Sequence, residues 1–248
     1  EIRLSLVGSE MCIRDSWSVE TFGIDAFRVD TYKYCNVDVM NRLNKALLDE
    51  YPKIFTFGEC WVEGVASQAY YVENNYNLPF KSNLKATSDF SLLFGGILPA
   101  LNESNGWSNG VIKLYNTLAS DFLYKQANNN VIFLDNHDMT RIHSSLGESI
   151  PKTKMAYAWL YTCRGIPQLY YGSEILMKGI SNPDGWVRLD FPGGWAGDKK
   201  NAFTETGLTK DEADFLHYVQ ALGAYRTKSS ALKTGQMMQY IPEDGLYV

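Results

Sequence analysis

Segments typical of β-strands alternate with segments typical of helices along most of this chain, and this alternation is what most constrains its fold. Apolar, β-prone runs predict strands at residues 24–29, 54–57, 131–134 and 166–171. Helical patterns predict helices at residues 37–50, 90–101, 111–124 and 210–225. A further helix is expected to enclose residues 155–163, with Pro151 in its first turn and Gly165 at its end. Strands separated by helices pair in parallel through right-handed crossovers, so the sequence predicts an α/β fold.

The helical spacing also predicts which side chains are buried. In the segment 37–50, which Pro52 closes, three side chains share one face: Met40, Leu43 and Leu47. In the segment 111–124, four side chains are expected on one side: Ile112, Tyr115, Leu118 and Phe122. Residues 60–103 are rich in Asn, Ser and Gly, and we expect a long crossover decorated with loops there.

Three of the apolar runs lead into a carboxylate. The three segments are Phe27-Arg-Val-Asp-Thr-Tyr-Lys-Tyr34, Phe55-Thr-Phe-Gly-Glu-Cys-Trp61 and Phe133-Leu-Asp-Asn-His-Asp138. The carboxyl ends of parallel barrel strands meet at one mouth, so Asp30, Glu59 and Asp138 are expected to gather there. Paired carboxylates are what glycoside cleavage needs, and the pattern therefore indicates a glycoside-cleaving site.

Arg28 lies two residues before Asp30, so both side chains fall on the same face of a strand. Phe27 and Val29 then point the other way, towards covering helices. A guanidinium this close favours the ionised carboxylate that a nucleophile requires. An ordinary ion pair at a strand end explains the spacing equally well, and the residues alone do not choose between the two interpretations.

The other two acids also allow two interpretations each. Apolar residues precede Glu59, and an apolar setting suits a carboxyl that must deliver a proton, but a solvated loop Glu is the simpler interpretation. Trp61 is a candidate platform for a sugar ring, or a core Trp. From the residues alone, His137 is interpreted as a structural histidine, and Asn136-His137-Asp138 as a turn or a metal corner. With three His in the chain and no second ligand motif, a zinc site is not indicated.

Composition narrows the class of protein. The formal net charge of −5 argues against a nucleic-acid partner, for which a basic patch is expected. Aromatic residues make up 14% of the chain and would serve as sugar-stacking platforms, although burial is the simpler expectation for any single ring. No apolar run in the sequence approaches the length of a membrane-spanning helix. Cys35, Cys60 and Cys163 form no CxxC pair, so we expect free buried thiols.

The order and wording of the three acid-bearing segments resemble the α-amylase superfamily, glycoside hydrolase family 13. An Arg two residues before the first Asp and a Gly before the Glu belong to the same pattern. Further along, Arg164-Gly-Ile-Pro-Gln-Leu-Tyr-Tyr-Gly172 is similar to the family's eighth barrel strand. The segment Arg188-Leu-Asp-Phe-Pro-Gly-Gly-Trp195, with Asn201-Ala-Phe203, is similar to the neopullulanase and cyclomaltodextrinase branch. The resemblance covers the chain from Trp17 to Val248.

This resemblance implies a particular α/β fold. Residues 17–235 would form the C-terminal part of a (β/α)8 TIM barrel, strands four to eight, and residues 236–248 would begin a C-terminal β domain. Strands one to three would then be missing, so the chain is expected to be a truncated fragment. An unclosed barrel exposes strand edges, and we expect the fragment to aggregate or stay partly unfolded when it is expressed alone.

The resemblance also implies roles for individual residues. It makes Asp30 the nucleophile, Glu59 the general acid and base, and Asp138 the acid that binds the distorted sugar and stabilises an oxocarbenium-like transition state. His137 would bond to sugar hydroxyls. The further expected substrate-binding residues are Arg28, Lys33, Tyr34 and Trp61. Tyr34 stands where many members carry a His, which leaves the aglycone preference open.

The implied activity is a retaining hydrolysis of α-1,4-glucosidic bonds in an α-glucan such as maltodextrin, cyclodextrin, pullulan or starch. Such a double displacement needs two carboxyls ~5 to 5.5 Å apart. Glucoside transferases and isomerases of the family share the same residues, and a non-catalytic sugar-binding or transporter-associated relative ranks lower because all three acids are present. No cofactor is required and no metal is assigned, although structural calcium is compatible with a full-length parent. Oligomeric state is left open, and the bacterial periplasm or cytoplasm is expected.

Residues 1–16 differ from the rest of the chain. Glu10-Met-Cys-Ile-Arg-Asp-Ser16 resembles a translated transposase sequencing adapter, and Leu6-Val-Gly-Ser9 fits the primer tail upstream of it. We therefore interpret residues 1–16 as a library artefact and exclude them from the fold. The alternative is a natural N-terminal strand, because residues 2–7 partly alternate between apolar and polar.

Overall fold

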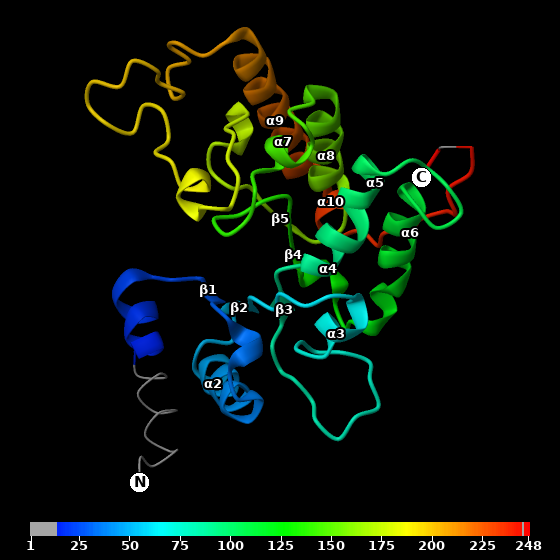
Figure 1. Ribbon diagram of the computed structural model, residues 1–248. Coiled ribbons are helices and arrows are strands. Elements are labelled where there is room, and N and C mark those ends of the chain that lie inside the picture. Colours follow the sequence, from blue (N-terminus) through cyan, green and yellow to red (C-terminus); the bar gives the residue numbers. More distant parts are fainter. Residues whose placement is uncertain (1–13, 245) are drawn as a thin grey trace. The chain divides into compact units, whose positions relative to one another are not determined.

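A computed structural model describes residues 14–244 and 246–248 of the chain (Figure 1). Most of the expected adapter segment lies outside the described residues, and residues 14–22 are helical. The chain divides into two compact units. One holds the chain up to Gly96 together with Asn116–Val131, and the other holds Ile97–Tyr115 together with Ile132–Val248.

A parallel three-stranded sheet organises the first unit. Its strands are β1 (Ala26–Val29), β2 (Phe55–Gly58) and β3 (Ala86–Thr87), in the order β1-β2-β3. The register pairs Ala26 with Phe55 and Val29 with Gly58, so β1 and β2 end side by side. This parallel pairing confirms the pattern that the alternation of strands and helices predicted.

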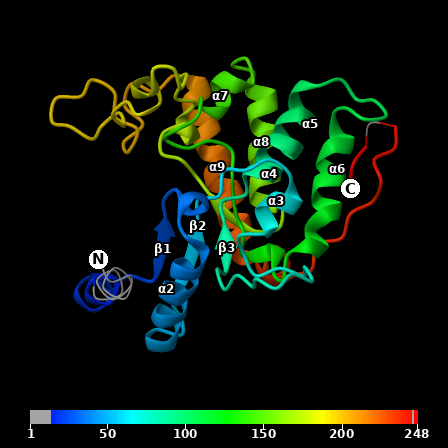
Figure 2. The same cartoon turned by 60° about the horizontal axis from the view of Figure 1, so that its bottom comes forward.

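Helix α2 (Val37–Glu50) connects β1 to β2 and lies beside both strands (Figure 2). It has the predicted bounds. The Asn36 side chain caps it by accepting hydrogen bonds from the first-turn backbone N–H groups, and the helix ends just before Pro52. The side chains predicted to face inward are 2–3% exposed: Met40, Leu43 and Leu47. Because Phe27 and Val29 pack against the same core, the opposite face of β1 is left for Arg28 and Asp30.

Close packing at the end of β2 explains why residue 58 is a glycine. A Cβ atom added to Gly58 would lie 2.8 Å from Cγ of Tyr32 and 3.0 Å from Cδ2 of Leu84. Both neighbours are buried, and the Tyr32 hydroxyl is held by the Asn44 side-chain amide. The Gly before the Glu in the sequence is therefore a site where the strand packs with no room for a side chain.

The long crossover after β2 contains more regular structure than the sequence predicted. It holds α3 (Val65–Ala69) and β3, neither of which was expected. The helix expected at 90–101 is instead α4 (Phe90–Leu92), a π-helical turn η2 (Leu93–Ile97) and α5 (Leu98–Asn102). Elements of two to five residues are too short to show a periodic pattern, which explains why α3 and β3 escaped the sequence analysis.

The segment predicted as one helix at 111–124 consists of α6 (Val111–Ala119) and the 3-10 turn η3 (Ser120–Leu123). The predicted apolar face was partly wrong. Leu118 is buried as expected, but Phe122 is 71% exposed and Leu114 is buried instead. A 3-10 turn has three residues per turn, so it rotates Phe122 away from the face that the α-helical spacing assigned to it.

The second unit contains the two-stranded sheet of β4 (Val131–Phe133) and β5 (Ile166–Gln168). Besides α5 and the first part of α6, this unit contains the helices α7 (Ile142–Ser145), α8 (Ile150–Thr162), α9 (Lys210–Lys228) and α10 (Ser230–Thr234). Helices α8 and α9 pack side by side in both views (Figures 1 and 2). Tyr157 meets Phe215 edge to face, with ring centroids 5.2 Å apart. The Arg226 guanidinium ties α9 to the residues after α8 by donating to the carbonyl oxygens of Cys163 and Gly165.

Several boundaries in this unit differ from expectation. Strand β5 ends at Gln168 rather than at residue 171, and α9 continues three residues past 225. Within the described part of 236–248 the backbone forms one isolated antiparallel bridge, between Glu243 and Leu246, and the expected C-terminal β domain stays a prediction. Helices in the described chain are too short or too polar to cross a membrane.

Gly58→Ala is predicted to destabilise the full-length parent protein by about 1–3 kcal/mol, because the added methyl group overlaps the Tyr32 ring. Urea unfolding measures this loss. Gly106→Ala is the matched control, since a Cβ there meets no heavy atom within 4 Å. Equal unfolding midpoints for the two variants would contradict the packing explanation.

Candidate active site

One arginine joins two of the predicted catalytic acids. Nη1 of Arg28 lies 2.7 Å from Oδ1 of Asp30, and Nη2 lies 2.9 Å from Oε1 of Glu59. The geometry follows from the sheet register, because Arg28 pairs with Phe57 and the ladder continues through a hydrogen bond from the Glu59 N–H to the Val29 carbonyl. The fork of one guanidinium thus holds the two carboxyl groups as direct neighbours at the carboxyl ends of β1 and β2.

The two carboxyl groups have different surroundings. The side chain of Asp30 is 67% exposed, whereas that of Glu59 is 8% exposed. Oε2 of Glu59 accepts a hydrogen bond of 2.9 Å from the backbone N–H of Thr31, a residue with a left-handed φ of 48°. The expected apolar setting of Glu59 is therefore incomplete, because a cation and a backbone donor hold its two oxygens. The left-handed backbone at a non-Gly residue is a strained conformation that this contact accompanies.

Cys60, the neighbour of Glu59, is fully buried. Burial raises the pKa of its thiol to about 12, so it stays protonated and is a poor nucleophile. Cys163 is also a buried free thiol, and Cys35 is a half-buried one. The expectation of free thiols is confirmed for all three, and that of burial for two of them.

Three further predicted substrate-binding residues lie beside this pair of acids in the chain. Lys33 belongs to the 3-10 turn η1 (Tyr32–Tyr34), and its Nζ donates to the Trp61 carbonyl and lies 4.8 Å above the Tyr34 ring. Tyr34 is 77% exposed. The loop after β1 is thereby fastened to the loop after β2.

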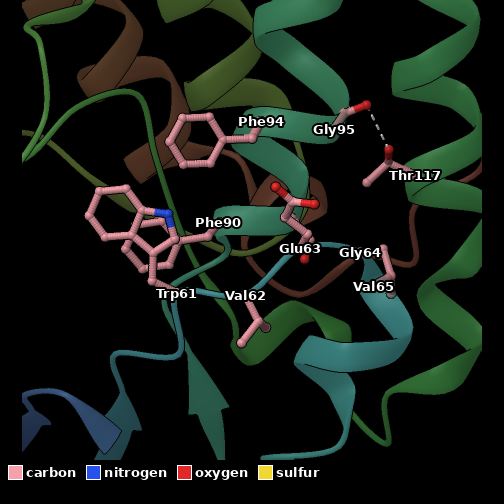
Figure 3. Close-up of a pocket in the computed structure, with 10 residues that line it drawn as sticks. Trp61, Val62, Glu63, Gly64, Val65, Phe90, Phe94, Gly95 and Thr117 are labelled. Atoms are coloured by element: carbon pink, nitrogen blue, oxygen red, sulfur yellow. Dashed lines mark hydrogen bonds between the residues drawn. The ribbon is translucent and has the colours of Figure 1, made fainter. Parts of the chain in front are cut away.

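Trp61 is neither a core residue nor a free surface ring. It stacks nearly parallel on Phe90 at 4.7 Å and on Phe94 at 5.9 Å, and it keeps 37% of its surface exposed. Figure 3 shows these three rings at one side of a cavity of about 460 Å³, with the Glu63 carboxylate also directed into it. The arrangement is a broad apolar platform with a carboxylate nearby, which suits the apolar face and the hydroxyl groups of a sugar.

The third acid lies in the second unit with its own arginine. Nη2 of Arg188 bonds Oδ1 of Asp138 at 2.8 Å, and its Nε donates to the His137 carbonyl at 2.9 Å. The same guanidinium contacts Asp184 at 3.0 Å. Nε2 of His137 lies 3.2 Å from Oδ2 of Asp138. The segment that begins with Arg188 contributes to the family resemblance, but no sequence pattern indicated its contact with Asp138.

The loop that carries His137 and Asp138 starts from a buried polar network. Oδ2 of Asp135 accepts hydrogen bonds from the Ser173 hydroxyl at 2.6 Å and from the Ile142 N–H at 2.8 Å. Burial raises the pKa of this carboxyl. The Asn136 side chain then accepts from the Asp138 N–H at 2.8 Å, which is the turn that the sequence offered as an alternative. The turn at residues 136–138 therefore carries the candidate site residues His137 and Asp138, so the two interpretations do not exclude each other.

Arg141 completes this network and was also missed. It is fully buried, and it donates to the carbonyl oxygens of Tyr171 and Val187. Its guanidinium lies 4.7 Å from the centroid of the Tyr170 ring. Neutral carbonyls and an aromatic face thus stabilise a buried cation, and no sequence spacing marks such partners in advance.

The structure therefore brings the predicted residues together in two groups. The first unit holds Arg28, Asp30, Lys33, Tyr34, Glu59 and Trp61, and the second unit holds His137 and Asp138. Among the described residues, no group of three or more His, Cys, Asp or Glu side chains is arranged to bind a metal ion.

Arg28→Met is predicted to destabilise the parent protein by about 1–3 kcal/mol, because it leaves the buried Glu59 carboxylate without its cation. The double variant Arg28→Met/Glu59→Gln should recover part of the loss, since the unpaired charge is gone. Lys45→Met, which removes an exposed pair with Asp49, is the control and should cost no more than ~0.5 kcal/mol. If urea unfolding showed equal destabilisation by Arg28→Met and Lys45→Met, the role of Arg28 in bridging Asp30 and Glu59 would be contradicted.

Asp135 also predicts a pH dependence of stability. Its pKa is raised in the folded protein, so the folded state binds the proton more tightly than the unfolded state does. Its contribution is fully present below about pH 4 and is lost as the pH rises through the folded pKa. In Asp135→Asn, stability should fall less over this rise than in the parent protein, as measured by thermal unfolding across the pH range. Parallel curves would contradict this assignment.

Several known proteins resemble this chain in sequence. Residues 10–231 match the family model described as alpha amylase, catalytic domain. A cyclomaltodextrin glucanotransferase of Bacillus sp. (strain 1011) is 34% identical over 67% of this chain and 22% of its own length. Alpha-amylase 3 of Dictyoglomus thermophilum is 27% identical over 90% of this chain and 46% of its own length. The chain thus spans less than half of either relative.

Solved structures of low sequence identity share the fold. An α-amylase from Geobacillus thermoleovorans, solved in complex with acarbose, superposes with a TM-score of 0.75 at 22% identity, covering 98% of this chain and 49% of that one. A cyclic α-maltosyl-(1→6)-maltose hydrolase from Arthrobacter globiformis gives a TM-score of 0.73 at 16% identity, covering 96% and 47%. The fold is that of the α-amylase catalytic domain, a TIM-barrel family, while the numbering of the strands as four to eight stays a prediction. With the match to the family model, these likenesses show that the chain belongs to the α-amylase family.

Proposed function

We propose that the protein containing this chain is a retaining glycoside hydrolase that cleaves α-1,4-glucosidic bonds in α-glucans. The observation that carries the proposal is the Arg28 fork, which holds an exposed carboxylate and a buried one side by side. A retaining enzyme needs two neighbouring carboxyl groups with different tasks, a nucleophile and an acid and base. Difference in environment is the usual means by which two carboxyls are given different tasks.

In the first step, an oxygen of Asp30 attacks the anomeric carbon while the bond from that carbon to the leaving oxygen breaks. Glu59 gives its proton to the leaving oxygen, and a glycosyl ester of Asp30 forms. In the second step, Glu59 takes a proton from water, the water oxygen attacks the anomeric carbon, and the ester bond breaks. Asp30 leaves as the carboxylate, so the enzyme returns to its starting state.

Arg28 supports both steps with a single charge. In the free enzyme the Arg28 guanidinium contacts both carboxyl groups. Once Asp30 becomes an ester it loses its charge, and Glu59 is then the acidic partner that stays beside the guanidinium. Glu59 is the base required for the second step.

Asp138 and His137 have the proposed role of binding the hydroxyls of the distorted sugar. Arg188 contacts Asp138 and holds it in place, and a carboxylate at this position would stabilise positive charge in the transition state. The neopullulanase and cyclomaltodextrinase branch remains our proposal for the subgroup. Maltodextrin, cyclodextrin, pullulan and starch are the candidate substrates, in keeping with relatives that act on or bind such glucans.

A glucanotransferase is the second candidate. The 34% identity to a cyclomaltodextrin glucanotransferase favours it, and the same residues would serve if a sugar hydroxyl replaced water in the second step. The aromatic platform at Trp61 could hold such an acceptor. An isomerase would share the same two acids, and a non-catalytic sugar-binding relative would have no use for them.

Asp30→Asn and Glu59→Gln in the full-length parent are predicted to lower turnover of maltodextrin by about 10²- to 10⁴-fold, because each removes one partner of the double displacement. Asp49→Asn, an exposed surface change, is the control. Proton NMR of the first product should show the α-anomer. The isolated 248-residue chain is expected to show no turnover.

The outcomes separate the candidates. A β-anomeric product would contradict retention, and unchanged turnover in Asp30→Asn would reject the nucleophile. Longer oligosaccharides or cyclic products would identify the transferase. Binding of maltodextrin without turnover in the intact parent would indicate the non-catalytic relative.

A further inference from the structure

A second, larger cavity in the first unit begins at two residues that the proposed function already uses. Its volume is about 1050 Å³, and Lys33 and Trp61 both line it. From there the cavity continues over the loop and helix that follow Trp61 in the chain. The further lining side chains used in this inference are Tyr70, Tyr71, Tyr76 and Leu78. We call this cavity the tyrosine groove.

The tyrosine rings of the groove are held in place by packing. Tyr70 meets Tyr71 edge to face, with centroids 5.4 Å apart, and lies 5.8 Å from the Phe80 ring. The Tyr76 hydroxyl donates to the Ala66 carbonyl at 2.6 Å. All three tyrosines are partly exposed, so rigid ring surfaces are presented to a ligand at low entropic cost.

The charges around the groove favour a neutral ligand. Lys33 and Glu63 both line it, one of each sign, and the Lys33 ammonium is already bound to the Trp61 carbonyl. A phosphate or a carboxylate would therefore find no cluster of free cations among these residues. A sugar chain fits better, because each pyranose ring offers an apolar face for an aromatic ring and hydroxyls for polar groups.

The position of the groove indicates which part of the glucan it would take. Trp61 follows Glu59 by two residues, and Lys33 follows Asp30 by three, so the groove opens from the loops that carry both acids. Glu59 is the proposed proton donor to the leaving group. A chain that extends from the leaving group would therefore run along the groove.

We propose that the tyrosine groove binds the leaving-group side of an extended α-1,4-glucan and gives the enzyme a preference for long substrates over short ones. This inference rests on the proposed hydrolase function. It adds three tyrosines that neither the sequence analysis nor the family resemblance assigned to substrate.

Ser67→Trp tests the groove by filling it. Ser67 lines the groove from α3 and is exposed, so the bulky ring removes no packing from the core. In the full-length parent, the ratio of kcat/KM for maltoheptaose to that for maltotriose should fall by about threefold to tenfold, which corresponds to the loss of one aromatic contact. Ser67→Ala, which leaves the groove open, should keep the parent ratio.

Tyr70→Leu is an independent test, because it keeps an apolar side chain against Tyr71 and Phe80 but removes the flat ring. Tyr225→Leu, at an exposed tyrosine of α9, is its control. Both variants are checked for an unchanged melting temperature. A lower ratio in Ser67→Trp and Tyr70→Leu, with both controls at the parent value, supports the groove.

Other outcomes overturn it. If maltotriose and maltoheptaose lose activity in equal proportion, or if neither variant changes the ratio while the parent is active, the groove does not bind substrate and the proposed function stands. If the intact parent acts on no α-glucan, the proposed function fails, and this inference fails with it.

Discussion

The positive charge of Arg28 holds together the part of the first unit that carries Asp30 and Glu59. Glu59 is nearly buried, and a buried carboxylate is tolerated only with a close cation or several donors. Arg28 is that cation, and the Thr31 N–H is the further donor. Because Arg28 lies on β1 and Glu59 follows β2, the ion pair also joins the two strand ends and the loop between Asp30 and Lys33. The position of Asp30, the burial of Glu59 and the path of the backbone thus depend on one side chain.

The features with a repeating pattern were predictable from the sequence. Helix α2 was predicted with its observed bounds because its inward positions recur every three to four residues and Pro52 closes it. The face that carries Arg28 and Asp30 was predicted because side chains alternate along a strand. These are local rules, and they hold wherever an element is long enough to express them.

The features that depend on distant partners were not predictable. Helix α3 and strand β3 are short and take their conformation from tertiary contacts, and Phe122 turned outward where the helix tightened into a 3-10 turn. Arg188 lies 50 residues from Asp138, so no spacing relates them. Of the two aspartates near the end of β4, the family resemblance pointed to Asp138, and no sequence pattern indicated that Asp135 is buried beside it in a polar network.

The reactivity of Cys60 offers a way to measure local opening at the end of β2. Alkylating reagents attack the thiolate, and this thiol is both fully covered and kept protonated by burial. Modification therefore requires the strand end to open, and under rapid reclosing its rate is set by the equilibrium between closed and open forms. Slow labelling of Cys60, compared with the half-buried Cys35, would give the free energy of local opening one residue from the proposed acid, without any substrate. Cys60 is thus a native probe of how rigidly the protein holds Glu59, the proposed proton donor.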